Sequence, residues 1–311
     1  MISLPAIPPP AAAPVWSWAR VRALVLDSVS STHSRRVYAK ALDDFWNWSQ
    51  QSAVSGFTRE AVQRYRAHLE DRGIAPASLN LHLTVLRKLA HEAAANGILA
   101  QEVAASITGI KGVRQKGGRL GTWLTLDQAQ ALLKTPKGDG IRARRDRALL
   151  ALLVGCGLRR SELATLDLAR IQQREGRWVV VDIEGKGNRV RSVPMPAWAK
   201  AAIEGWTAAA HIESGRLFRA ISQKGDLGES LTAQAVYLIV KRHAEEIGVE
   251  IAPHDLRRTF AKLAHRGRSP LEQIQLSLGH ESILTTERYL GVRQSFTDAP
   301  CDHLEIELEE V

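Results

Sequence analysis

The chain has 311 residues, of which 45% are hydrophobic and 24% charged, a composition typical of globular proteins that argues against wholesale disorder. Lys and Arg number 42 against 33 Asp and Glu, which gives a formal net charge of +9. Because five of the acidic residues fall within positions 301–311, the remainder of the chain is more basic still. Such a chain attracts polyanions, so we expect nucleic acid or an anionic membrane surface as its partner.

The membrane alternative finds little support in the sequence. The longest apolar run, residues 148–158, falls well short of the roughly 20 residues that span a bilayer. The N-terminus has no Lys or Arg before Arg20 and is broken by prolines, unlike a secretory signal. Neither Cys156 nor Cys301 has a partner at metal-ligand spacing. We therefore expect a soluble cytoplasmic protein, associated with the nucleoid when bound to DNA, with no membrane partner, disulfide or metal site.

The first third of the chain has a helical pattern. Residues 1–20 are rich in Pro and Ala and are expected to be flexible. Three helices are predicted after them: one capped by Ser31 or Thr32 and continuing through Trp46, one from Thr58 to Gly73, and one from about Ala77 to Asn96. No strand pattern interrupts them, so residues 21–108 predict a small all-helical domain.

Polar and basic residues recur along two helix faces of this domain. They are Arg35, Arg36 and Lys40 on the first face and Asn80, Thr84, Arg87, Lys88 and His91 on the second. Side chains of these types bond phosphates and base edges, although any single one could belong to an ordinary solvated face. We expect the domain as a whole to contact DNA.

A short basic segment, 109–121, separates this domain from the rest. Its residues 109–119 contain four glycines and the basic residues Lys111, Arg114, Lys116 and Arg119. Glycine makes the segment flexible and its charge suits it to lie along phosphates, so we expect a hinge that touches nucleic acid; an ordinary linker is the alternative.

Beyond the hinge, residues 122–295 mix helices with a small sheet. Thr125 and Gln128 fit a capping box. Strands are predicted over 178–183 and 189–195, joined by a turn that carries Lys186. A further helix is expected at 144–154, and another follows the second strand and ends at about residue 207. Helices are also expected at 231–247, 254–266, 270–278 and 282–290. The whole chain is thus predicted to be mainly α with a small β-sheet: a helical domain, then an α+β domain, then an acidic tail over 296–311.

Several short motifs place reactive side chains at helix ends. In GCGLRRSEL, Arg159 follows a glycine at the end of an apolar helix, and Glu162 stands three residues later, where it can support an arginine. In PHDLRRTFA, His254 and Arg257 share one helix face. In LGH, His280 precedes Tyr289 of TTERYL by nine residues. Each residue taken singly is more often structural.

Taken in order with EGKGNRVRSVP, these motifs resemble the tyrosine recombinase (phage integrase) family. The resemblance is strong over 123–291 and looser over 21–108, which is similar to the family's helical, SAM-like core-binding domain. It implies a catalytic domain of the DNA breaking-rejoining type over 122–295. The departures are Cys156, where Thr is frequent, and Leu290-Gly291 after the tyrosine.

The resemblance implies a role for each matched residue. Tyr289 would attack a DNA phosphorus to give a 3′-phosphotyrosyl bond and a free 5′-hydroxyl. Arg159 and Arg257 would hold the non-bridging oxygens, His254 would assist proton transfer, and His280 would donate a hydrogen bond to the phosphate. Lys186 would act as general acid for the 5′-oxygen, and Glu162 would support Arg159. Cations fixed where charge develops can carry this chemistry without metal or other cofactor, and the phosphotyrosyl bond lets the strand rejoin without ATP.

The expected partner is a double-stranded DNA recombination site on which a homo- or hetero-tetramer assembles from a chain that can be a monomer in solution. Leu304, Ile306 and Leu308 alternate with glutamates, so 296–311 is expected to dock on a neighbouring subunit or on its own basic surface; a disordered tail is the alternative. The short N-terminus favours a two-domain recombinase of the Xer or mobile-element type. Two alternatives stay open at this point: a type IB topoisomerase and a non-catalytic DNA-binding regulator.

Overall fold

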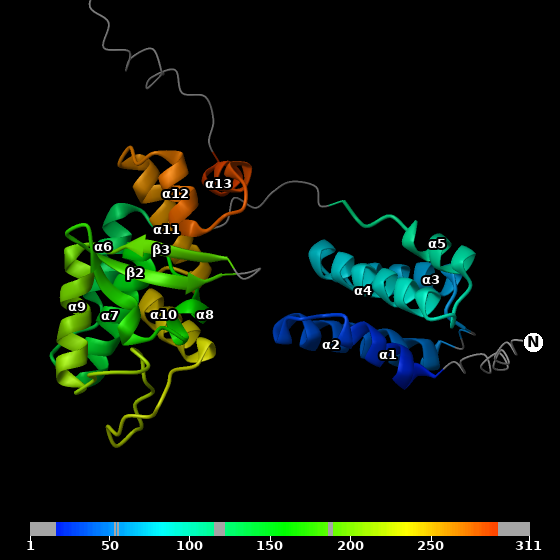
Figure 1. Ribbon diagram of the computed structural model, residues 1–311, viewed down its shortest axis with the longest axis horizontal. Helices are drawn as coiled ribbons and strands as arrows, with labels where there is room; N and C mark the ends of the chain where they lie inside the picture. Colours follow the sequence, from blue (N-terminus) through cyan, green and yellow to red (C-terminus); the bar gives the residue numbers. More distant parts are fainter. Residues whose placement is uncertain (1–16, 53, 55, 115–121, 186–188, 292–311) are drawn as a thin grey trace, which may run out of the picture. The chain divides into compact units, whose positions relative to one another are not determined.

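The computed structural model describes residues 17–52, 54, 56–114, 122–185 and 189–291. The chain divides into two compact units, residues 1–118 and 119–311, each of which is built around its own core (Figure 1). Among the described residues, no helix is long and apolar enough to cross a membrane.

All the regular secondary structure described in the first unit is helical. Its helices are α1 (Trp18–Asp27), α2 (Thr32–Gln51), α3 (Arg59–Asp71), α4 (Pro76–Ala95) and α5 (Gln101–Thr108). Ser31 and Thr58 cap α2 and α3 as expected, since their hydroxyls accept the N–H groups of Ser34 and Ala61. Helix α4 packs against the four others and buries the leucine face that its spacing predicts.

The second unit combines helices with a three-stranded sheet. Its helices are α6 (Leu126–Lys134), α7 (Ile141–Cys156), α8 (Arg160–Ala164), α9 (Ala197–Ala209), α10 (Ala233–Glu246), α11 (Pro253–Arg266), α12 (Leu271–Leu278) and α13 (Ile283–Leu290), with a 3-10 turn at Leu168–Arg170. Its strands are β1 (Ile171–Arg174), β2 (Arg177–Glu184) and β3 (Val190–Pro194), in the antiparallel order β1-β2-β3. The predicted class, mainly α with a small sheet, is confirmed.

Helix α7 is the centre of this unit. Every residue from Ala148 to Leu153 is at most 2% exposed, because α6, α8, α9, α10 and α11 all contact the helix. Figure 1 shows α9 running alongside α7. An all-round apolar helix is stable only where it is covered on every side, which explains why this run has no polar face.

The sheet ends in a hairpin whose second strand faces the C-terminal helices. Val180 pairs with Val193, and the register then shifts before Ile183 pairs with Arg191. Asp182 lies inside this bulge with φ of 50°, a left-handed conformation that Asp tolerates better than β-branched residues do. Helix α12 contacts β3, while α11, α12 and α13 pack on one another (orange in Figure 1).

A prediction concerns Gly157, which ends α7 with φ of 60°. A Cβ at this position would lie 2.7 Å from Cδ1 of Phe260, whereas one at Gly176, with φ of 73°, would meet nothing within 4 Å. Left-handed strain costs about 1–2 kcal/mol at either site, and overpacking adds about 1–3 kcal/mol at Gly157. Gly157→Ala should therefore lower the free energy of unfolding by more than Gly176→Ala does. Urea unfolding of the full chain, followed through amide exchange of α7 peptides, checks this; equal losses would contradict it.

Candidate active site

Arg159 and Glu162 form an ion pair where α7 turns into α8. Gly157 reverses the chain, and Arg159 stands at the N-cap of α8. The Glu162 carboxylate accepts the backbone N–H of Arg159 at 2.8 Å and its guanidinium NH1 at 2.6 Å. Glu162 therefore holds Arg159 at both its backbone and its side chain, which is the contact that the three-residue spacing predicts.

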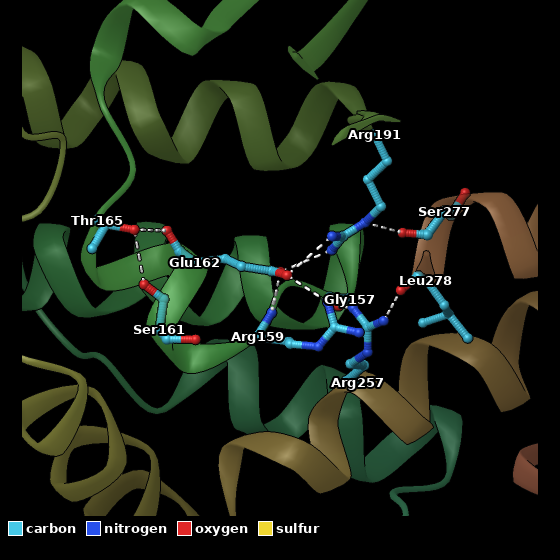
Figure 2. A network of polar contacts seen from close by, with 9 residues as sticks. All are labelled: Gly157, Arg159, Ser161, Glu162, Thr165, Arg191, Arg257, Ser277 and Leu278. Carbon is cyan, nitrogen blue, oxygen red and sulfur yellow. Dashed lines mark hydrogen bonds and ion pairs between the residues drawn. The ribbon is translucent and has the colours of Figure 1, made fainter. Parts of the chain in front are cut away.

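A second arginine, Arg191 of β3, donates two hydrogen bonds to the same carboxylate. Its NH1 and NH2 lie 3.0 Å and 2.8 Å from the two carboxylate oxygens of Glu162 (Figure 2). Burial alone raises the pKa of Glu162, but the hydrogen bonds from Arg191 and Arg159 outweigh it and lower the pKa to about 2. Glu162 is thus an anion at neutral pH. Sequence reasoning missed Arg191, although its position two residues before buried Val193 puts it on the inward face of the strand.

Arg257 completes a cluster of guanidinium groups. Its side chain lies in α11, is 1% exposed, and donates to the carbonyls of Gly157 and Leu278. Burial and the charges of Arg159 and Arg191 lower its pKa to about 9, so it stays protonated at neutral pH. Three positive guanidinium groups therefore accompany one carboxylate, which two of them bind, and the positive surplus suits the site to a bound anion.

The Tyr289 side chain contacts a backbone carbonyl, two imidazole rings and a guanidinium group. Its hydroxyl donates to the backbone carbonyl of His254 at 3.3 Å. The rings of His254 and His280 meet it edge to face at 5.7 Å and 5.3 Å, and the Arg258 guanidinium carbon lies 4.8 Å from its centroid. Burial raises the pKa of Tyr289, against the opposing effect of Arg257 and Arg258. The phenol is therefore protonated at neutral pH and needs a proton acceptor before it can attack.

Both histidines are kept neutral by their surroundings. His280 follows Gly279, whose φ of 60° forms the turn, and its Nδ1 lies 2.9 Å from the hydroxyl oxygen of buried Thr286. Burial and the charges of Arg257 and Arg159 lower the pKa of His280 to about 4. The His254 side chain is exposed, yet partial desolvation and the neighbouring arginines lower its pKa as well. Neutral imidazoles can accept a proton or donate a hydrogen bond.

A small pocket of about 330 Å³ joins several of these groups. It is lined by Arg159, Arg160, Ser161, Tyr237, Ala252, Pro253, His254 and Arg257. Tyr237 of α10 was not anticipated, because nothing in the sequence around it differs from an ordinary amphipathic helix. The pocket offers a concave, cationic surface beside His254, whose backbone carbonyl accepts the hydrogen bond from Tyr289.

The predicted Lys186 lies outside the described residues. The residue before it belongs to the site: a Cβ on Gly185 would lie 3.5 Å from NH1 of both Arg159 and Arg191. The described end of the hairpin therefore adjoins the guanidinium cluster. No group of three or more His, Cys, Asp or Glu that could hold a metal occurs among the described residues.

Several residues predicted to bind DNA have partners inside the first unit. The Asn80 amide donates to the Val113 carbonyl and accepts the Val113 N–H, both at 2.9 Å, and Arg87 donates to the Ile110 carbonyl. These bonds hold the start of the basic segment against α4. The other partners are intramolecular too: Arg35 with Val29, Lys40 with Asp44, Thr84 with Asn80, and Lys88 with Glu92. Their contact with DNA stays a prediction.

Three more predicted DNA ligands are exposed: Arg36, Lys111 and Arg114. Arg36 also lines, with Lys40 and Arg72, a groove of about 780 Å³ over α2, α3 and α4. Lys116 and Arg119 lie outside the described residues.

Comparison with known proteins supplies independent findings. Residues 122–295 match the Phage integrase family, and residues 21–97 match the Phage integrase N-terminal SAM-like domain. Tyrosine recombinase XerC of Pseudomonas fluorescens is 32% identical over 266 residues, which cover 83% of this chain and 85% of the relative. Tyrosine recombinase XerD of Pseudomonas aeruginosa is 29% identical over 283 residues, or 88% of this chain and 91% of the relative.

Solved structures share the fold. XerH site-specific recombinase bound to its difH substrate before cleavage aligns with a TM-score of 0.68 at 19% identity, over 91% of this chain and 82% of that one. A lambda integrase dimer bound to a COC′ core site aligns with a TM-score of 0.66 at 17% identity, over 94% and 78%. The sequence matches and the arginine cluster beside a histidine-flanked tyrosine lead to one conclusion: the chain belongs to the phage integrase family and is a tyrosine recombinase.

Proposed function

We propose that this site-specific recombinase cuts and rejoins DNA with Tyr289 as nucleophile and Arg159 and Arg257 as the phosphate-binding pair. The observation that carries this assignment is the convergence of the guanidinium cluster, both histidines and the tyrosine hydroxyl from separate segments of the second unit. A phosphodiester resists attack because of its own charge, so fixed cations are what its displacement requires.

The reaction exchanges one ester for another. The Tyr289 oxygen forms a bond to phosphorus, the bond from phosphorus to the 5′-oxygen breaks, the phenolic proton leaves the tyrosine, and a proton reaches the 5′-oxygen. The product is again a phosphodiester, so the reverse step with a different 5′-hydroxyl needs no ATP. Neutral His254, whose ring meets the Tyr289 ring edge to face at 5.7 Å, is suited to accept the phenolic proton.

The remaining roles follow the same logic. His280 donates a hydrogen bond to the phosphate, Glu162 orients Arg159, and Lys186 protonates the 5′-oxygen. The position of Gly185 beside Arg159 supports the role of Lys186. We assign the core-binding domain to 21–108, the linker to 109–121, the catalytic domain to 122–295 and a docking tail to 296–311. The reaction requires neither metal nor other cofactor.

The proposed partner is a double-stranded recombination site bound in the cytoplasm. The XerH structure is bound to its difH substrate and the lambda integrase structure is a dimer bound to a COC′ core site, and both support this partner. Recombination pairs two sites, each bound by two subunits, so we propose a homo- or hetero-tetramer. The XerC and XerD relatives favour a two-domain enzyme of the Xer type.

Direct tests begin with the DNA. Duplexes retained by the purified chain from a random-sequence pool give the site, and a nicked suicide version of it should trap a covalent complex with the wild-type chain and none with Tyr289→Phe. Plasmids carrying two copies should recombine, whereas a topoisomerase would relax plasmids that lack the site. Retention of a specific duplex without any covalent complex would indicate a non-catalytic regulator and refute the proposal.

Arg159→Lys keeps the charge but loses the two-pronged guanidinium. Because a single arginine at a phosphoryl group is worth on the order of 10³–10⁵ in rate, single-turnover cleavage should slow by at least about 10²-fold. Arg170→Ala is the control, since Arg170 makes an exposed pair with Asp182 at 2.9 Å. Cleavage by Arg159→Lys at the rate of this control would show that Arg159 does not bind the phosphate.

The lowered pKa of His280 makes stability depend on pH. The folded chain binds this proton only near pH 4, while the unfolded chain binds it near 6.5. As pH falls from 6.5 to 4 the unfolded state gains the proton first, so stability is present above this window and is lost through it. Urea unfolding of the DNA-free chain should therefore lose more stability across the window in wild type than in His280→Asn. An identical loss in both would show that His280 does not have the lowered pKa.

A further inference from the structure

Arg191 has no role in the steps above, yet its side chain is among the most constrained in the site. Only 8% of the side chain is exposed, and all three of its nitrogens donate hydrogen bonds. Two go to Glu162, and the third, from Nε, goes to the Ser277 carbonyl at 2.9 Å. Figure 2 shows the guanidinium between Glu162 and the end of α12.

The bonds from Arg191 to Glu162 act on the same carboxylate that binds Arg159. Arg191 and Arg159 both bond the same Glu162 oxygen, Oε1, at 3.0 Å and 2.6 Å. Without Arg191, the carboxylate would keep two bonds to Arg159, from NH1 to Oε1 and from the backbone N–H to Oε2, and only the first of these reaches the guanidinium. The two parallel bonds from Arg191 fix the plane of the carboxylate and so the direction in which it holds Arg159.

The second contact reaches the turn that presents His280. Ser277 lies in the last turn of α12, and a Cβ on Gly279 would lie 2.8 Å from Cδ of Arg191. The arginine stem therefore fills the space beside the glycine that precedes His280. One side chain thus connects the α7–α8 corner, strand β3 and the α12–α13 turn.

A residue that served only to stabilise the fold would not need to be an arginine paired with a buried carboxylate. A buried ion pair is often no more stabilising than a packed hydrophobic pair of the same volume, because both charges lose their water. What the pair supplies is a defined geometry for Arg159, and displacement of a catalytic group by about 1 Å can cost about 10²-fold in rate.

We propose that Arg191 is a positioning residue for strand cleavage, which acts through Glu162 to orient Arg159 toward the non-bridging phosphate oxygen. This inference rests on the proposed function. In this inference Arg191 affects how well the negative charge on the phosphate is stabilised, and it does not affect protonation of the leaving 5′-oxygen.

Three versions of the selected nicked duplex separate these effects. The first has an ordinary scissile phosphate, the second a methylphosphonate that lacks one negative oxygen, and the third a 5′-bridging sulfur that leaves without a proton. On the ordinary duplex, Arg191→Met should cleave about 10²-fold more slowly than wild type in single turnover. On the methylphosphonate most of this deficit should disappear, as it should for Arg159→Lys. On the sulfur duplex it should persist. Arg191→Lys, which keeps the charge, should fall between wild type and Arg191→Met.

Arg170→Met is the matched control, because it removes an exposed pair between the 3-10 turn and Asp182 of β2 in the same sheet as Arg191. It should stay within about twofold of wild type on all three duplexes, as surface pairs contribute little. If Arg191 works through Glu162, the double variant Arg191→Met/Glu162→Gln should be no slower than the slower of its two single variants. Circular dichroism at the assay temperature establishes that each variant is folded.

The outcomes are distinct. A deficit rescued by sulfur would place Arg191 on the leaving group, and an equal deficit on all three duplexes would make it a structural residue; either result overturns the inference. Should Arg191→Met fail to fold, the same comparison is made with Arg191→Lys and Glu162→Gln, and absence of methylphosphonate rescue there also overturns it. Absence of covalent complex with wild type on the ordinary duplex would instead refute the proposed function.

Discussion

The structure of the site depends on one electrostatic imbalance. Arg159 and Arg191 both bind a single buried carboxylate, Glu162, and Arg257, whose bonds go to backbone carbonyls, adds a third charge, so the cluster keeps a positive surplus. Buried charge without a counter-ion is costly, and the site tolerates it here because carbonyls of Gly157, Leu278 and Ser277 accept the remaining hydrogen bonds. Under the proposed function, a DNA phosphate would supply the missing negative charge. Binding of the substrate would then also neutralise the surplus charge of the cluster.

The fold brings these groups together by ending helices at the right places. Gly157 and Gly279 both adopt left-handed backbone conformations, one before Arg159 and the other before His280. Each is also too close to a neighbouring side chain to accept a Cβ, Phe260 in the first case and Arg191 in the second. The short loops they form leave α8 and α13 little freedom, so Arg159 and His280 are presented by rigid turns.

Sequence patterns foretell most of this architecture, for identifiable reasons. Helices with long apolar stripes, such as α4, and the capping box at Thr125 follow local rules and were predicted. The sequence did not indicate β1 or α5, because β1 is four mostly polar residues and α5 is only eight residues long. Arg191 escaped notice because its importance lies in a contact with Glu162, 29 residues away along the chain. Long-range pairing of this kind leaves no local pattern, and only the face alternation of β3 hints at it.

The central claim is that the arginine cluster near Tyr289 binds a DNA phosphate. The pKa of His280, measured with and without DNA, tests this claim most directly. Burial, together with the charges of Arg257, Arg159 and Arg191, lowers its pKa to about 4 in the free chain. NMR titration of labelled histidines in Tyr289→Phe, free and bound to the selected duplex, measures this value in both states. The account predicts a pKa far below 6.5 in the free chain and a clear rise on binding, as the phosphate offsets the arginines. An ordinary pKa in the free chain that does not move when DNA binds would contradict it.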